Sequence, residues 1–332
     1  MRRLLALLAC VAATPPAAAQ SVEDFYRGRQ IRVIVGSSAG DYDTWARLVA
    51  RHMRQYVPGN PNFVIENMPG AGSLIAANYI YNKAPQDGTV LGSVSRNIPN
   101  FALMKHANAN FDPLKFNWIG SPEMTHRACY ARADAGITSP EKLFEREVMM
   151  GGDGVGTSLS EMPVLLKNLL GMKFKVVDGY KGSTEIVLAV ERNEVQGICQ
   201  TVLAFATSGQ HLLDNGTVKM LFTTEHDPIY PHVPSVFQYA KTQEQRDILS
   251  FHSSSLETGR PWLATPNIPR ERVQALRRAY DATMKDAGFL AEAKQRKLSV
   301  DPRTGEYVEG VIRAVAALPP ALIAKAAEMT RK

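Results

Sequence analysis

Short apolar runs alternate with amphipathic stretches along most of this chain. Residues 31–35 form an apolar run of strand length. The stretch that follows places apolar side chains on one helix face, namely Trp45, Leu48, Val49 and Met53. Repeated along the chain, this alternation predicts an α/β architecture with mainly parallel sheets.

The same pattern predicts the remaining elements. Strands are predicted at residues 63–66, 89–94, 117–120, 128–131, 148–150, 174–177, 195–199 and 218–222, and helices at 73–81, 159–170 and 183–192. From Pro269 onward the pattern is almost wholly helical, with helices predicted at 270–285, 287–297 and 305–331. A helical tail needs a surface to pack on. A chain that leaves one domain, builds a second and returns to the first would supply it.

The first residues have the three parts of an export signal. Arg2 and Arg3 precede an apolar stretch at residues 4–13, and Ala17-Ala18-Ala19 offers a cleavage site after Ala19. Processing as a lipoprotein at Cys10 is an alternative, although it leaves a very short apolar stretch. No other segment approaches the roughly 20 apolar residues of a membrane span. We therefore expect a soluble chain exported to the periplasm.

Composition narrows the class further. The 332 residues suit about two domains. The net charge of +6 falls to +4 without Arg2 and Arg3, and the basic residues are scattered, so no nucleic-acid partner is expected. Cys129 and Cys199 lie in apolar runs. A disulfide is permitted in an oxidising compartment, but two buried thiols are favoured. The histidines and cysteines lack metal-binding spacing, so neither metal nor cofactor is expected.

Four loops that contain glycine each follow a predicted strand and precede a helix. They span residues 36–43, 67–73, 151–158 and 179–183. Backbone N–H groups and the helix dipole make such loops suitable for anions, and Asp43 is the expected N-cap of the first helix. Hydroxyls that could donate to a carboxylate belong to Ser37, Ser38, Thr157, Ser158 and Ser183. The loops match neither a P-loop nor a dinucleotide fingerprint, so a shared cleft for an organic acid is favoured.

Arg96 follows the strand at residues 89–94, at the strand end where open α/β sheets bind ligands. Its guanidinium could clamp a carboxylate, and a surface or interdomain salt bridge is an equal alternative. Tyr42 could line an apolar part of the ligand. Trp45 is expected to pack in the hydrophobic core, on the apolar face of its helix.

Residues 36–40 also spell G-x-S-x-G, the nucleophile elbow of α/β hydrolases. That motif requires a sheet built before the serine, and one strand alone precedes Ser38 here. Asp41 and Asp43 are better explained as loop and cap residues. A secreted serine hydrolase that uses Ser38 is therefore kept only as an alternative, and no enzyme is expected.

Several motifs then follow in a specific order. They are Glu66-Asn67-Met68-Pro69-Gly70-Ala71-Gly72, Pro85-Gln86-Asp87-Gly88-Thr89, Phe111-Asp112-Pro113, Tyr180-Lys181-Gly182-Ser183, Gly259-Arg260-Pro261 and Pro266-Asn267-Ile268-Pro269. In this order the chain resembles the periplasmic solute receptors of tripartite tricarboxylate transporters, the TctC-like or Bug family. The resemblance covers essentially the whole mature chain.

The resemblance implies a type II periplasmic-binding-protein fold, in which two α/β lobes joined by two strand crossings close on a small organic acid. It places the first lobe at residues 20–124 and 229–332 and the second at 125–228. It further implies a monomer that delivers its ligand to membrane permease subunits. The ligand-binding residues carried over by position are Ser37, Ser38, Ala39, Gly40, Asp41, Tyr42, Asp43, Gly70, Ala71 and Arg96 in the first lobe, and Gly156, Thr157, Ser158, Gly182, Ser183 and Thr201 in the second.

Three departures from the family pattern fall in the predicted cleft. Gly36-Ser37-Ser38 replaces a proline-rich opening, Ser160 replaces a histidine, and Gly179 replaces a proline. Ligand identity therefore does not transfer from better-known members. A bulkier or aromatic carboxylate is as compatible as a dicarboxylate or tricarboxylate, and a receptor that feeds a sensor kinase is the alternative to transport.

Overall fold

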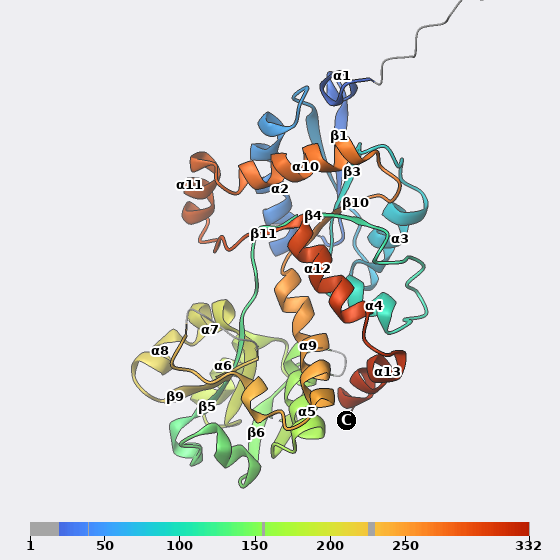
Figure 1. Ribbon diagram of the computed structural model, residues 1–332. Helices are drawn as coiled ribbons and strands as arrows, with labels where there is room; N and C mark the ends of the chain where they lie inside the picture. The colour runs from blue at the N-terminus through green and yellow to red at the C-terminus, as the bar shows by residue number, and fades with distance from the viewer. Residues whose placement is uncertain (1–19, 39, 155–156, 225–229, 332) are drawn as a thin grey trace, which may run out of the picture.

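Two separate sheets, each covered by helices, form the upper and lower parts of the molecule in Figure 1. The computed structural model describes residues 20–38, 40–154, 157–224 and 230–331. The predicted export signal, with Ala19 and Cys10, lies outside these residues. The predicted two-lobed α/β fold is confirmed.

The sheet of the first lobe has the strand order β11-β4-β10-β3-β1-β2. Its strands are β1 Gln30–Val35, β2 Asn62–Asn67, β3 Val90–Ser93, β4 Asn117–Ser121, β10 Trp262–Ala264 and β11 Arg303–Thr304. The helices around it are α1 Val22–Tyr26, α2 Asp41–Met53, α3 Leu74–Asn82, α4 Ile98–Leu103, α10 Arg270–Thr283, α11 Ala287–Gln295 and α12 Gly305–Ala316. Trp45 is 1% exposed in the core of this lobe, as predicted.

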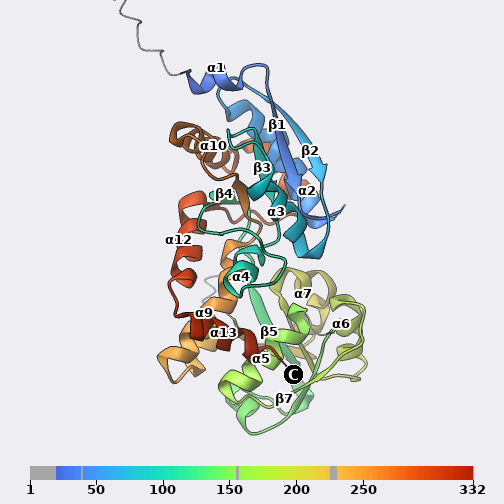
Figure 2. The same ribbon diagram turned by 90° about the vertical axis from the view of Figure 1, so that its right-hand side faces the viewer.

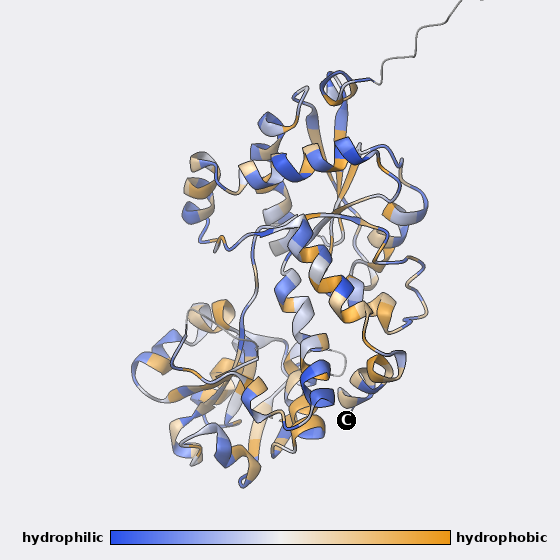
Figure 3. Cartoon of the chain, in the orientation of Figure 1, coloured by the Kyte–Doolittle hydropathy of each residue, from blue (hydrophilic) through white to orange (hydrophobic). Residues whose placement is uncertain are grey.

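The sheet of the second lobe has the order β7-β6-β8-β5-β9. Its strands are β5 Arg127–Arg132, β6 Val148–Gly151, β7 Phe174–Val177, β8 Gly197–Thr201 and β9 Val218–Thr223. Its helices are α5 Ser158–Leu170, α6 Ser183–Glu191, α7 Val202–Ser208 and α8 Gln210–Asp214. In Figure 3 the helices of both lobes carry hydrophilic and hydrophobic colours together, as amphipathic helices on a sheet should.

The prediction of mainly parallel sheets is wrong, because five of the nine strand pairings among the described residues are antiparallel. β2, β1 and β3 run parallel, as do β7, β6 and β8, but β10 is antiparallel to β3 and β4. β5 is antiparallel to both β8 and β9. The reason is the route of the chain. The chain enters β5 from the first lobe, so β5 runs away from the junction. β8 runs toward the junction, and its last residue, Thr201, pairs with Arg127, the first residue of β5.

The chain passes between the lobes first at residues 122–126 and again through a long helix, α9 Gln243–Thr258. Figure 1 shows α9 running between the two parts of the molecule. Its Ile248 and Phe251 are buried in the core of the second lobe, while its Leu256 carbonyl accepts a hydrogen bond from Thr125 N at 3.1 Å. The expectation of two strand crossings is therefore wrong for the second, which is helical.

The predicted helix at residues 305–331 is also wrong, because the structure contains two helices there. α12 ends before Pro319 and Pro320, and α13 Pro320–Met329 leaves at an angle of 95°. α13 packs on the second lobe, where Asn168 Nδ2 donates to the carbonyls of Met329 (3.0 Å) and Arg331 (2.9 Å). The lobes are thus connected at three places.

In the described part of the chain, no single helix is long and apolar enough to cross a membrane. The bent pair α12–α13 meets that criterion only when both helices are counted together. Apolar side chains of both helices, including Val308, Ile312 and Ile323, are buried in the two cores.

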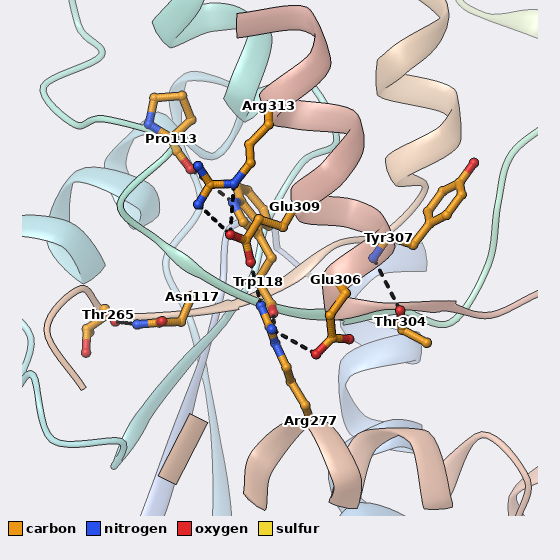
Figure 4. Close-up of polar contacts among 10 residues, drawn as sticks. All are labelled: Pro113, Asn117, Trp118, Thr265, Arg277, Thr304, Glu306, Tyr307, Glu309 and Arg313. Atoms are coloured by element: carbon orange, nitrogen blue, oxygen red, sulfur yellow. Dashed lines mark hydrogen bonds and ion pairs between the residues drawn. The ribbon is translucent and has the colours of Figure 1, made fainter. Parts of the chain in front are cut away.

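An ion-pair cluster fixes α12 to the strand that precedes the first crossing (Figure 4). Arg277 of α10 donates through Nε to the Trp118 carbonyl of β4 at 2.8 Å. The same guanidinium pairs with Glu306 at 2.9 Å and with Glu309 at 2.8 Å, both on α12. The Arg277 side chain is largely buried, and its contacts join α10, β4 and α12.

Cys129 of β5 and Cys199 of β8 form a disulfide, with their Cα atoms 4.0 Å apart. The preference for two free thiols is therefore wrong. The antiparallel register sets these two residues directly opposite each other, and both are fully buried. Their separation of 70 residues hid this pairing from the sequence.

Candidate functional site

The side chains of Asp43, Arg47 and Asn67 hold the first glycine loop, residues 36–43, in place. α2 begins at Asp41 with Gly40 as its N-cap, so the prediction of Asp43 as N-cap is wrong. The Asp43 carboxylate instead accepts from Arg47 Nε at 2.8 Å and from Asn67 Nδ2 at 2.8 Å. Arg47 thereby lowers the pKa of Asp43. Asn67 also donates to the Ser37 carbonyl at 2.9 Å, so these residues fix the loop's position.

Ser73 joins this loop to the segment that carries Arg96. Its hydroxyl donates to the Gly36 carbonyl at 2.9 Å and accepts from Ser95 N at 3.0 Å. Gly36 has no room for a side chain, because an added Cβ would lie 2.4 Å from the Ser73 hydroxyl. Ser73 holds a left-handed φ of 74°, and such backbone strain persists where the surroundings enforce it.

Arg96 has a buried Nη1 with no hydrogen-bond partner among the described residues. Its backbone N donates to Tyr42 Oη at 3.2 Å, and the Tyr42 ring lies 5.5 Å from the guanidinium of Arg260. Arg260 is itself buried and paired with Glu123 at 3.2 Å. The predicted alternative of a salt bridge for Arg96 is not seen in the part of the chain that the structure describes.

Two cavities lie where the lobes meet, and Arg96 lines both of them. One, of about 300 Å³, is bounded by residues of α4, α5 and α9, and we call it the α4–α5 cavity. The other, of about 420 Å³, follows the first crossing and α7, and we call it the crossing cavity. Figure 2 shows α4 near the junction, above the helices of the second lobe. Arg96 thus stands between two spaces open to a ligand.

The structure brings together four of the predicted site residues. Tyr42, Arg96 and Ser158 line the α4–α5 cavity, and Arg96 and Thr201 line the crossing cavity. The described candidates that line neither cavity are Ser37, Ser38, Gly40, Asp43, Gly70, Ala71, Thr157, Gly182 and Ser183. Ala39, Gly156 and the side chain of Asp41 lie outside the described residues.

Thr157 of the third glycine loop and Ser160 of the helix that follows use their hydroxyls for contacts within the second lobe. Thr157 Oγ1 contacts the Asp153 carboxylate and the Gly154 carbonyl. Ser160, which the resemblance predicted to replace a histidine, accepts from Gly154 N at 3.0 Å and donates to Asp178 at 2.7 Å. Ser158 is exposed at the start of α5. A role for Thr157 as a ligand donor stays a prediction.

No family model matches the chain. A UPF0065 protein from Cupriavidus necator is 28% identical over 228 residues, which span 66% of this chain and 66% of that protein. A TctC solute-binding protein from Polaromonas has a TM-score of 0.71 at 18% identity, covering 90% of this chain and 99% of its own. An R. palustris protein solved with adipate has a TM-score of 0.58 at 21% identity, covering 91% and 97%.

The chain is similar in fold to TctC-like, or Bug, proteins and similar in sequence to the UPF0065 protein. The predicted resemblance is thereby confirmed. At 18% to 21% identity the solved structures speak for the fold alone.

Several residues that line the two cavities were not predicted from the sequence. Arg127, the first residue of β5, donates through Nη1 to the Ser158 carbonyl at 3.2 Å. Glu161 of α5 faces the same cavity, and burial raises the pKa of its carboxyl against the opposing charge of Arg127. His252 lies on α9, which the pattern did not predict. Arg127 directly precedes the predicted strand at residues 128–131, and Arg260 belongs to the motif Gly259-Arg260-Pro261. Nothing in the sequence pattern marked Glu161 as a lining residue.

In the part of the chain that the structure describes, no group of three or more His, Cys, Asp or Glu side chains is arranged to hold a metal ion. The charged groups that line the α4–α5 cavity are two guanidinium groups, Arg96 and Arg127, and one carboxyl, Glu161. Polar and apolar side chains form the rest of its wall. Such a set can bind an anion, with the guanidinium fork of Arg96 as donor.

His252 predicts a pH dependence of stability. Burial lowers the pKa of His252 to about 4, while its Nε2 lies 3.0 Å from the Ala326 carbonyl. An unfolded histidine titrates near pH ~6.5, so the unfolded state takes up a proton first as the pH falls. Stability should therefore drop by about 3 kcal/mol between pH ~6.5 and ~4, and flatten below that.

Urea unfolding at pH values across this window tests the effect. The His252→Gln variant should lose most of that slope, whereas His232→Gln, which alters an exposed histidine, should keep it. Equal slopes in the wild type and His252→Gln would contradict the assignment.

Proposed function

We propose that this chain is an extracytoplasmic receptor that captures a small organic carboxylate between its lobes and delivers it to a tripartite tricarboxylate-type transporter. The observation that carries the proposal is the buried Arg96 Nη1, which lacks a partner among the described residues and lies between two cavities. An unsatisfied buried donor is costly, and a carboxylate would satisfy it with a charge-assisted hydrogen bond.

Lobe closure would complete the site. Arg96 is held on the first lobe by contacts of its loop with Ser73 and Tyr42, while Ser158 and Glu161 approach from the second. Hinge motion at the three connections would bring these walls together around the ligand. The predicted donors outside the two cavities, such as Ser37 and Ser183, would be recruited in the closed form. The R. palustris neighbour solved with adipate supports a carboxylate as the ligand class.

A thermal-shift screen of aliphatic and aromatic mono-, di- and tricarboxylates tests the binding step. Each acid is paired with its neutral amide, because the amide keeps the shape and loses the charge. An acid at 100 times its Kd should stabilise the protein by about 2.7 kcal/mol, and its amide should have little effect. If no acid raises the Tm, the proposal fails.

Delivery is tested separately from binding. The ligand-bound receptor, reconstituted with a large and a small permease subunit in vesicles, should support uptake of the labelled acid. Ligand-dependent stimulation of a sensor kinase without uptake would instead support the sensing alternative. Ester hydrolysis that is lost in Ser38→Ala would support the hydrolase.

A further inference from the structure

We infer that the carboxylate is a monocarboxylate with an apolar body, either an aliphatic chain or an aromatic ring, that lies in the α4–α5 cavity. This inference rests on the proposed function and specifies its ligand class. It departs from the dicarboxylate held by the adipate-bound neighbour.

The first step is the count of available cationic donors. Among the described residues that line the α4–α5 cavity, Arg96 offers a buried nitrogen without a partner. Arg127 already donates to the Ser158 carbonyl and faces Glu161. The crossing cavity is lined by Arg96 and by Arg260, and Glu123 pairs with Arg260 at 3.2 Å. One guanidinium group therefore matches one carboxylate.

The second step is the charge opposite Arg96. Glu161 lines the same cavity from α5, where burial raises the pKa of its half-buried carboxyl and the charge of Arg127 opposes that rise. A second ligand carboxylate beside it would add a like charge in a partly desolvated space. Such juxtaposition of like charges is a strong discriminator between ligands. Glu161 thus disfavours dicarboxylates and tricarboxylates.

The third step is the apolar wall. The lining side chains that suit a hydrocarbon are Phe101, Met104, Met162, Leu165, Phe251 and Leu256. A cavity of about 150 Å³ with such a lining holds a benzene ring, so about 300 Å³ has room for a ring and its carboxylate. Methionine side chains adapt to bodies of different shape. Burial lowers the pKa of His252, which also lines this cavity, and the second cation of the wall, Arg127, is engaged by the Ser158 carbonyl and lies close enough to Glu161 to lower its pKa.

Matched acids test the inference directly. Hexanoate and adipate have the same chain length and differ by one carboxylate, as do benzoate and terephthalate. By titration calorimetry on the mature full-length chain, we expect each monoacid to bind at least ~10-fold more tightly than its diacid. A diacid that binds as tightly as its monoacid overturns this inference and leaves the proposed function standing. If neither acid binds and no other carboxylate does, both fail.

Two variants separate the role of Glu161 from a general effect on the fold. Glu161→Gln should raise the affinity for the diacid by about tenfold and leave the monoacid nearly unchanged. Glu147→Gln, which alters an exposed residue of the same lobe, should change neither. An unchanged preference in folded Glu161→Gln overturns the assigned role. If that variant does not fold, the comparison of acids in the wild type still decides the ligand class.

Discussion

Arg96→Ala is expected to weaken binding of the cognate carboxylate by roughly 100-fold, or about 3 kcal/mol. The side chain carries the buried unpartnered Nη1, and both cavities open onto it. Its removal deletes the charge that offsets the desolvation of the carboxylate. The methyl ester of the same acid lacks the carboxylate charge and should bind the wild type more weakly. Arg96→Ala should therefore change the affinity for the ester much less than the affinity for the acid. Titration calorimetry of the acid and the ester with both proteins measures the difference.

Two further substitutions control this result. Arg96→Lys keeps the charge but loses the planar fork, so its affinity should fall between those of the wild type and Arg96→Ala. Arg192→Ala removes an exposed arginine of the second lobe and should bind like the wild type. Wild-type affinity in a folded Arg96→Ala protein would remove Arg96 from the site.

Nine of the eleven strands in the described residues were predicted, because their apolar runs are short and sharply bounded, whereas β10 and β11 were missed. The prediction for residues 174–177 agrees with β7 Phe174–Val177, and that for residues 31–35 differs from β1 by one residue. Strand direction was not predictable in this way. A buried strand has the same composition whether its neighbours are parallel or antiparallel, and only the route between the lobes reversed β5 and β10.

α9 escaped prediction because polar residues interrupt its buried apolar face. Ser253 and Ser254 are 2% and 3% exposed, where a helix face normally has apolar residues. The Ser254 hydroxyl donates to the Phe251 carbonyl at 2.6 Å, and Asn100 of α4 donates to the same carbonyl at 3.1 Å. Hydrogen bonds thus satisfy buried polar groups of this crossing helix, and no hydropathy pattern reports them.

A site residue was predictable only where a side chain able to bind an anion stood at the carboxyl end of a predicted strand. Arg96 stood at the carboxyl end of a predicted strand, and the structure places it at the junction of the lobes. Asp43 was assigned from its position alone, and its real partners, Arg47 and Asn67, lie on α2 and β2. Glu161 and His252 reach the cavity through packing between elements far apart in the sequence, and spacing along the chain does not record this.

Loss of the disulfide is expected to be the largest single effect on stability. Cys129→Ala/Cys199→Ala should lower the free energy of unfolding by about 4 kcal/mol, because the bond closes a loop of 70 residues in the unfolded chain. Urea unfolding of the double variant and of the oxidised wild type measures the difference. Reduced wild type is the matched control, since it keeps both sulfur atoms and should lose most of the same free energy.

The position of the bond links this loss to the cleft. In the same ladder, two residues from each cysteine, Arg127 lies opposite Thr201, and each of them lines one of the two cavities. The disulfide therefore fixes the register of the strand that enters the second lobe against the strand that ends beside α7. In the double variant, ligand should still bind the folded fraction, with a weaker apparent affinity set by the population that folds. An unfolding midpoint equal to that of the oxidised wild type would show that the antiparallel pairing holds these strands without the bond.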